Sequence, residues 1–378
     1  MMRDIGKRLQ QLKTRRSGTD RIGQVDFSEG LQVLAKSLSD EPYTRRATGQ
    51  KHTQYALGAM QPVDANYTRI SLEEAERVGK QLDSGLRARG VDVGFRLQGS
   101  VPCDIHIRGV SDVDLLVLDE GFFTYDTSGL RARSGHFTSP LSYTPLSALM
   151  RLRNSAETIL QDKFPQATVD TSGAKAIKLS GGSLRRPVDV VPSHWHDTVD
   201  YQASRREPDR GIQILDKPVP ASVLNMPFRH IERINQHDAL ARSGLKKAIR
   251  LLKNVKADAV EEGSKIPLPS FDIAAAMWHA DLTALAAGSV YELAIVAEAT
   301  RHLDHLARNT AFAKTLMVPD GSRPIFNTPE KVEALIQLSL EMDDLALQIG
   351  REQERLLQQM QPSRQQIDAV LRRAIIPT

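Results

Sequence analysis

The 378-residue chain has only one cysteine, Cys103, so it can form neither an intramolecular disulfide nor a cysteine-based zinc site. It also lacks a long uninterrupted apolar run. The most apolar stretch, residues 272–297, contains two aspartates, a glutamate and a histidine, and is too polar to span a bilayer. Residues 1–16 are basic without an apolar core, which does not fit a secretory signal. We therefore expect a soluble, cytoplasmic protein with no membrane partner.

Neither sign of charge dominates the sequence. Lys and Arg number 50, Asp and Glu number 46, and the formal net charge is +4, which excludes a polybasic nucleic-acid arm and an acidic tail protein. Hydrophobic residues make up 40% of the chain, as in ordinary globular proteins, and the length suggests about two domains. The small basic excess is also compatible with an RNA or DNA activator, although a solvated surface explains it equally well.

Strand and helix patterns are mixed in the first part of the chain. Residues 28–39 predict a short amphipathic helix and residues 40–66 predict a loop. The Ser71-Leu-Glu-Glu74 segment has the form of a capping box, so we expect the next helix to begin at Ser71 and to end near Arg89. Strands are expected at 93–98, 113–118, 174–179 and 187–191, with a helix at 147–164 and a hairpin turn at 181–183.

After Pro218 the pattern becomes almost entirely helical. This order predicts an α+β fold with an irregular or helical N-terminal segment (1–66), a mixed α/β core (67–218) and a helical domain (219–378). The expected helices of the last part are 226–238, 239–256, 270–287, 291–316, 329–358 and 363–375.

Two carboxylates, Asp112 and Asp114, stand two residues apart at the start of an apolar strand. Residues at i and i+2 of a strand point to the same face, so the two negative charges repel each other unless a cation lies between them. Oxygen ligands alone suit Mg²⁺ or Mn²⁺, which are commonly shared with substrate phosphates. An Asp-x-Asp pair is common at strand ends, however, and carries little weight by itself.

Three further residues make the combination more specific. Gly99 allows backbone to approach a phosphate closely, and the hydroxyl of Ser100 can bind its oxygens. Asp189 lies in the apolar run Val188-Asp-Val-Val-Pro192, where a lone charge inside a sheet would be costly. Placed beside the other two carboxylates, Asp189 completes a site for two metal ions. Two ions about 3.5–4 Å apart support nucleotidyl transfer, because they activate a hydroxyl and stabilise leaving pyrophosphate.

These motifs resemble those of the cGAS/DncV-like nucleotidyltransferases, a family with a polymerase-β-like core. The resemblance covers roughly residues 72–287 and keeps the motif order. The matching segments are Gln98-Gly-Ser100, Ser111-Asp-Val-Asp-Leu115, Val188-Asp-Val-Val-Pro192, Asn225-Met-Pro-Phe-Arg-His230 and the stretch 244–253. It implies a nucleotidyltransferase core, a helical domain closing the active-site cleft, NTP substrates such as ATP, and a cyclic di- or oligonucleotide product. The resemblance to bacterial members also implies a role in anti-phage defence, with the effector encoded separately.

The resemblance also assigns roles to residues. Asp112, Asp114 and Asp189 are expected to be the catalytic metal ligands for two Mg²⁺ or Mn²⁺ ions. Gly99 and Ser100 are expected to hold the donor phosphates. In the family segment matching residues 244–253, a lysine resembles a triphosphate ligand, and here Lys253 and then Lys247 are the candidates.

The sequence departs from the family pattern at one place. Family members usually have Gly-Thr between the Gly-Ser pair and the acidic motif, where this chain has Asp104-Ile105. The spacing is kept, but the chemistry of the phosphate loop is altered. For stacking of the nucleotide base, the candidates are Trp195 and Tyr201, followed by Tyr125 and Phe137, since aromatic residues are only 5% of the chain. Each of them fits the protein core equally well.

Two other functions remain open at this point. The same chemistry could add nucleotides to RNA ends or to a protein target. The chain could also be a non-catalytic nucleotide-binding or RNA-binding module; the three carboxylates argue against this, and the Asp104-Ile105 departure keeps it open.

Overall fold

The computed structural model describes residues 4–17, 41–109, 112–137 and 142–377. They form two compact units, which we call the sheet unit (Asp64–Cys103 and Ser111–Glu232) and the helical unit (Met1–Val63, Asp104–Val110 and Arg233–Thr378). The units are defined by packing, and the domain boundaries expected near residues 66 and 218 stay a prediction. No helix among the described residues is long and apolar enough to cross a membrane.

The sheet unit is built around a seven-stranded mixed sheet. Strand β2 pairs antiparallel with β1 and parallel with β5, while the first half of β5 pairs with β4 and its second half with β6. The strands are β1 (Val93–Gln98), β2 (Val113–Tyr125), β3 (Thr168–Asp170), β4 (Ile177–Ser180), β5 (Val188–Asp197), β6 (Gly211–Asp216) and β7 (Ala221–Asn225).

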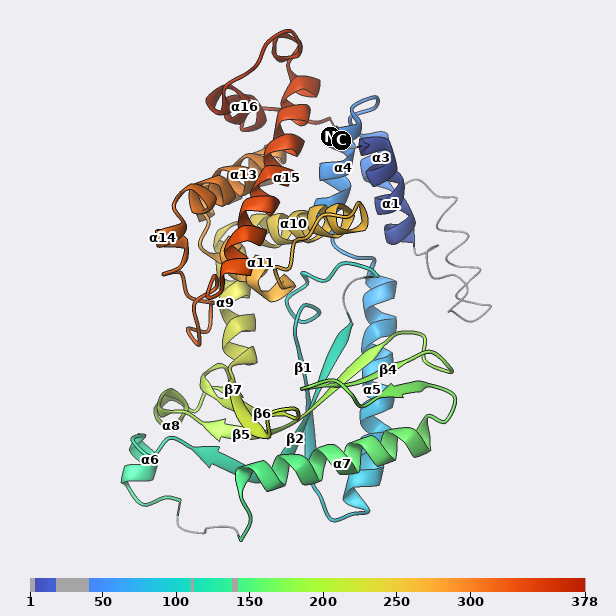
Figure 1. Cartoon of the computed structure of the whole chain (residues 1–378), viewed down its shortest axis with the longest axis vertical. Helices are drawn as coiled ribbons and strands as arrows, with labels where there is room; N and C mark the ends of the chain where they lie inside the picture. The colour runs from blue at the N-terminus through green and yellow to red at the C-terminus, as the bar shows by residue number, and fades with distance from the viewer. Residues whose placement is uncertain (1–3, 18–40, 110–111, 138–141, 378) are drawn as a thin grey trace. The chain divides into compact units, whose positions relative to one another are not determined.

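The two faces of this sheet differ because side chains alternate along each strand. One face, with Val113, Leu115 and Val190 among its residues, packs in one core with helices α5 (Ala65–Arg87) and α7 (Pro145–Lys163), as Figure 1 shows. The other face carries a second, smaller apolar cluster that includes Leu116, Val191, Trp195, Ile212 and Phe228. Asp112, Asp114 and Asp189 have the parity of this second face, so the sheet places them away from α5 and α7.

The helical unit is centred on α10 (Gly244–Glu261). Twelve of its residues are buried, and it contacts helices before and after it in the chain, including α4 (Lys51–Met60), α11 (Ser270–Trp278) and α15 (Pro329–Gln353). The remaining helices are α1 (Ile5–Ser17), α3 (Pro42–Arg45), α12 (Leu282–Ala286), α13 (Leu293–Arg308), α14 (Thr310–Ala313) and α16 (Arg364–Leu371), and α9 (Pro227–Leu240) runs from the sheet unit into this one.

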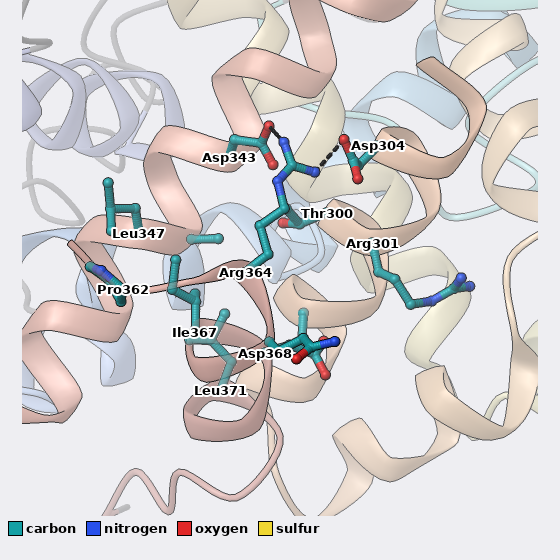
Figure 2. Close-up of a pocket in the computed structure, with 13 residues that line it drawn as sticks. Thr300, Arg301, Asp304, Asp343, Leu347, Pro362, Arg364, Ile367, Asp368 and Leu371 are labelled. Carbon is teal, nitrogen blue, oxygen red and sulfur yellow. Dashed lines mark hydrogen bonds and ion pairs between the residues drawn. The ribbon is translucent and has the colours of Figure 1, made fainter. Parts of the chain in front are cut away.

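Near the C-terminus a cavity of about 510 Å³ lies among α13, α15 and α16. Its walls are mostly apolar, and Figure 2 shows Arg364 reaching from α16 to both Asp304 of α13 and Asp343 of α15. One guanidinium therefore ties three helices together. Helix α16 also begins with the capping box of Ser363 and Gln366, in agreement with the helix expected at 363–375.

The start of the first long helix was predicted wrongly. Helix α5 begins after Asp64, whose side chain caps it by accepting hydrogen bonds from the backbone N–H groups of Asn66 and Tyr67. Ser71 lies inside the helix, where its hydroxyl donates to the carbonyl oxygen of Tyr67 at 3.0 Å. A serine followed by glutamate three residues later therefore does not act as a cap when an aspartate cap lies upstream.

Other expected elements also differ from the structure. The segment expected to be a loop, 40–66, contains α3 and α4. Helix α4 was missed because it buries every residue from Tyr55 to Met60 and so shows no amphipathic pattern. Strands β3, β6 and β7 were not predicted. The helix expected at 270–287 is two helices, since Asp281 caps α12 and interrupts it. The helix expected at 28–39 lies outside the described residues.

The buried histidine of α13 predicts loss of stability in acid. Burial lowers the pKa of His302 from 6.5 to about 4, and its Nε2 bonds the carbonyl oxygen of Ala276 at 2.9 Å. The unfolded chain therefore binds a proton that the fold rejects, and stability falls as the pH drops from 6.5 towards 4. In His302→Gln, the slope of unfolding free energy against pH in this window should decrease by up to about 1.4 kcal/mol per pH unit. Urea unfolding at several pH values measures it, and an unchanged slope would contradict it.

Candidate active site

The three acidic residues expected to bind metal share one face of the sheet. Asp114 of β2 is in register with Asp189 on the neighbouring parallel strand β5, and Asp112 lies two residues before Asp114. Asp114 and Asp189 are half-buried, with hydrophobic neighbours on both strands. This register agrees with the expectation that Asp114 and Asp189 lie on neighbouring strands of one face, and binding of metal by the three carboxylates stays a prediction.

Gly99 directly follows β1 and lies against the carboxylate of Asp114. Gln98, the last residue of β1, is paired with Asp114, and Gly99 follows with φ +78°, a left-handed conformation that favours glycine. A Cβ atom on Gly99 would overlap Oδ2 of Asp114 and would lie 3.2 Å from its carboxyl carbon. The Gly-Ser turn therefore packs on the Asp114 carboxylate, and half-buried Ser100 comes next in the chain.

A fourth charged residue, Lys178, lies at the site and was not predicted from the sequence. Lys178 of β4 pairs with Asp189 across the sheet, and its ammonium forms an ion pair with Oδ2 of Asp112. The strand pattern alone marks Lys178 only as an outward-facing residue. Its position beside the carboxylates follows from the register of β4 with β5, which a single sequence does not reveal.

The carboxylate oxygens of Asp112, Asp114 and Asp189 suit a hard divalent cation, although the three side chains are not positioned to bind one ion together in this structure. Burial raises the pKa of Asp189, and the nearby charge of Asp112 raises it further. Within the described part of the chain, Oδ1 of Asp189 is buried and accepts no hydrogen bond. No three His, Cys, Asp or Glu side chains of the described residues lie close enough together to hold a metal. In this state the cation nearest Asp112 is the ammonium of Lys178.

The two lysines expected to bind triphosphate lie in the helical unit. Lys253 is only 3% exposed, and its Nζ donates a hydrogen bond to the carbonyl oxygen of Ile105 at 2.7 Å. Lys247 is half-buried, with its Nζ 3.8 Å from Oε1 of Glu292. Both lie on α10, as expected, and a role for either in binding phosphate stays a prediction.

The first two aromatic candidates, Trp195 and Tyr201, are core residues of the sheet unit. Trp195 is 3% exposed, packs at 5.7 Å from the ring of Phe228, and donates its Nε1–H to Oε1 of Glu120. The guanidinium of Arg210 lies 4.4 Å from the ring centre of Trp195 and 4.8 Å from that of Tyr201. This packing leaves little ring surface for a nucleobase in the present conformation, and base stacking by either residue stays a prediction.

Comparison with known proteins identifies relatives along nearly the whole chain. A family model described as the cGAS/DncV-like nucleotidyltransferase C-terminal helical domain matches residues 232–342. The chain is 41% identical to the cyclic dinucleotide synthase CdnE of Yersinia aleksiciae over 364 residues, which cover 91% of this chain and 92% of that one. It is 30% identical to a c-di-GMP synthase of a Lachnospiraceae bacterium, with 83% of this chain and 96% of that one covered.

A solved structure agrees with these sequence matches. The STING-associated CdnE c-di-GMP synthase from Capnocytophaga granulosa superimposes with a TM-score of 0.68 at 28% identity, covering 91% of this chain and 97% of that one. The expected fold, a nucleotidyltransferase core followed by a helical domain, is confirmed by this match.

Proposed function

This chain belongs to the cGAS/DncV-like nucleotidyltransferases, and on that basis we propose that it condenses NTPs into a cyclic di- or oligonucleotide and releases pyrophosphate. It is a nucleotidyltransferase, and its relatives include named cyclic dinucleotide synthases. The observation that carries the proposal at the level of chemistry is the register of Asp114 with Asp189 beside the Gly99 turn. It gathers acidic oxygens next to a backbone turn suited to phosphate.

The acidic residues would hold the metal ions that such synthases generally need. We assign Asp112, Asp114 and Asp189 as ligands of two Mg²⁺ or Mn²⁺ ions, since their oxygens suit hard cations. When bound, the ions would lower the pKa of the attacking hydroxyl and stabilise the leaving pyrophosphate. Asp189 would also orient the ribose hydroxyl that attacks the α-phosphorus, or accept its proton, while the bond from the α-phosphorus to the pyrophosphate oxygen breaks.

The remaining candidates would bind the donor nucleotide. Gly99 and Ser100 would hold its β- and γ-phosphates through backbone N–H groups and the serine hydroxyl. Each ring closure would repeat the same step, because the linear intermediate keeps a 5′-triphosphate and a free ribose hydroxyl.

Lys178 should compete with the metal for Asp112. In Lys178→Met the ammonium beside Asp112 is gone, so a divalent cation no longer has to displace it. The concentration of Mn²⁺ needed for half-saturation, measured by electron paramagnetic resonance in the absence of nucleotide, should fall by about threefold to tenfold. The matched control, Lys175→Met, removes an exposed lysine outside β4 and should leave Mn²⁺ binding unchanged. Weaker Mn²⁺ binding by Lys178→Met would contradict the competition.

The reaction is tested with radiolabelled NTPs, Mg²⁺ or Mn²⁺ and then phosphatase. Label in a small, phosphatase-resistant product supports cyclic nucleotide synthesis. Label on RNA or protein instead would favour the alternative acceptors. Nucleotide binding without turnover, across metals and candidate nucleic-acid or protein activators, would make the chain a binding module.

We further propose that the product serves anti-phage defence in the cytoplasm and acts on an effector encoded separately. The support is that one similar synthase is described as STING-associated, which is said of that protein. Expression of the chain with its genomic neighbours, in cells challenged with phage, should reduce plaque formation. Equal plaque numbers with the active chain and with its Asp112→Asn/Asp114→Asn variant would refute the defence role.

A further inference from the structure

The chain between the two halves of the candidate site belongs to the helical unit. Gly99 and Ser100 lie in the sheet unit, as do Asp112 and Asp114, but the described connecting residues 104–109 pack with the helical unit. Ile105 and Ile107 are each 3% exposed. We call residues 104–107 the anchor segment. The anchor segment follows the Gly99-Ser100 turn in the chain and precedes the Asp112-Val-Asp114 motif. Contacts that hold the anchor segment therefore affect both of these parts of the site.

Two buried cations of α10 bind the backbone of the anchor segment. Nη1 of Arg250 donates to the carbonyl oxygen of Asp104 at 2.6 Å, and Nζ of Lys253 donates to that of Ile105 at 2.7 Å. Arg250 is 4% exposed and Lys253 3%. A buried cation is costly unless hydrogen-bonded, so these carbonyl contacts are part of what keeps both side chains in the core.

The same contacts account for the unusual residue in this segment. Asp104 has φ +52°, the left-handed region that glycine adopts readily and that aspartate tolerates better than most residues. Its carboxylate Oδ2 lies 3.4 Å from Nη1 of Arg250, in addition to the bond from that atom to its carbonyl oxygen. The position at which the family usually has glycine therefore keeps a glycine-like backbone, held by Arg250.

Helix α10 is itself a rigid support. Nε of Arg250 donates to the carbonyl oxygen of Met60 at 2.9 Å, and the side-chain amide of Asn254 donates to that of Ala59 at 3.0 Å. Both acceptors lie at the end of α4, which packs along α10. Arg250 thus binds the end of α4 on one side and the anchor segment on the other, and Lys253 extends from the same packed helix.

We propose that Arg250 and Lys253 are positioning residues that hold the anchor segment on α10 and thereby set the backbone conformation of the described residues that follow Ser100, up to residue 109. This deepens the proposed function and rests on it. In this state Lys253 acts on the reaction through the anchor segment, whereas the family resemblance implies direct contact with triphosphate. A partner or ligand that shifted α10 would act on the anchor segment through the same two side chains.

The test compares three methionine variants on one helix. Lys253→Met and Arg250→Met each remove a cation from the anchor segment. Lys256→Met is the matched control, because Nζ of Lys256 also donates to a carbonyl oxygen, that of Leu268 at 2.6 Å, away from the segment. Hydrogen exchange of peptides covering residues 103–109, without nucleotide, should be at least about tenfold faster in the first two variants and unchanged in the control.

Kinetics and a conservative change complete the test. With NTP and Mg²⁺, kcat should fall by about tenfold or more in Lys253→Met while KM stays within about twofold. Lys253→Arg, which keeps a cation, should restore much of the protection and of kcat. Asp104→Gly keeps the carbonyl oxygen that accepts from Arg250 and favours the left-handed backbone, so its hydrogen exchange at 103–109 should match that of the parent. This surface variant remains available if a methionine variant in the core does not fold.

Two results would overturn the proposal. A rise in KM for nucleotide with unchanged exchange at 103–109 would make Lys253 a phosphate ligand only. Equal loss of protection and of kcat in Lys256→Met would reduce the effect to general destabilisation. Failure of the parent chain to make any product, with the exchange pattern as predicted, would overturn the proposed function and support the anchoring contact.

Discussion

Asp114→Asn is expected to lower the rate of pyrophosphate release by at least about a thousandfold. Asp114 lies between its neighbours of the site, in register with Asp189 on one side and with Gln98, just before the Gly99 turn, on the other. An amide is a poor ligand for Mg²⁺ and does not supply the negative charge that the metal site requires. Steady-state release of pyrophosphate from NTP in the presence of Mg²⁺ measures the effect.

The same substitution should leave the fold intact. The carboxylates on this face repel each other without metal, so removing one charge should keep the melting temperature at or above that of the parent. Asp170→Asn, on the exposed edge strand β3 of the same sheet, is the control and should retain activity. Activity of Asp114→Asn close to that of the control, at saturating Mg²⁺, would show that the carboxylates do not form the metal site.

Gly99→Ala is expected to lower activity by about a hundredfold or more and to destabilise the sheet unit by roughly 1–3 kcal/mol. The new methyl group would overlap Oδ2 of Asp114, and alanine is strained at the φ of +78° found there. The chain can relieve the overlap only by displacing the carboxylate or the turn, and both changes disturb the site. Pyrophosphate release and urea unfolding measure the two effects.

Gly90→Ala separates backbone strain from the clash. Gly90 has φ +73°, close to that of Gly99, but nothing lies within 4 Å of a Cβ placed on it. Gly90→Ala should therefore be destabilised by backbone strain about as much as Gly99→Ala, while it keeps nearly full activity. Equal activity losses in the two alanine variants would contradict the claim that Gly99 acts through its contact with Asp114.

The candidate acidic site could be predicted because its signal is local. Asp112 and Asp114 are polar interruptions at the start of an apolar strand, and Asp189 is another in an apolar strand of its own. Asp112 and Asp114 are two residues apart, so strand alternation puts them on the same face. Burying a charged carboxylate without a cation or hydrogen-bond partner would be costly, which marks all three residues as candidates for a site. Strand ends were less predictable: the strand expected at 187–191 continues to Asp197 as β5.

The remaining features depend on contacts between segments that are far apart in the chain. Lys178 reaches Asp112 only through the register of β4 with β5. The cations of α10 look like a solvated stripe in the sequence, but Arg250 and Lys253 are buried and bind the backbone of the anchor segment. Trp195 packs against Phe228 and Arg210, and the residues around Trp195 in the sequence do not indicate these neighbours. The periodicity of one segment does not reveal which distant residues of the chain pack against it.

Mass spectrometry of the phosphatase-treated product tests the central claim most directly. From NTPs and Mg²⁺ the chain should make a species whose mass is the sum of its nucleoside monophosphates less one water per nucleotide, which is the mass of a closed ring. The species should be absent from reactions with Asp112→Asn/Asp114→Asn. A phosphatase-sensitive linear product, label on RNA or protein, or the same ring from the double variant would contradict cyclic nucleotide synthesis by this acidic site.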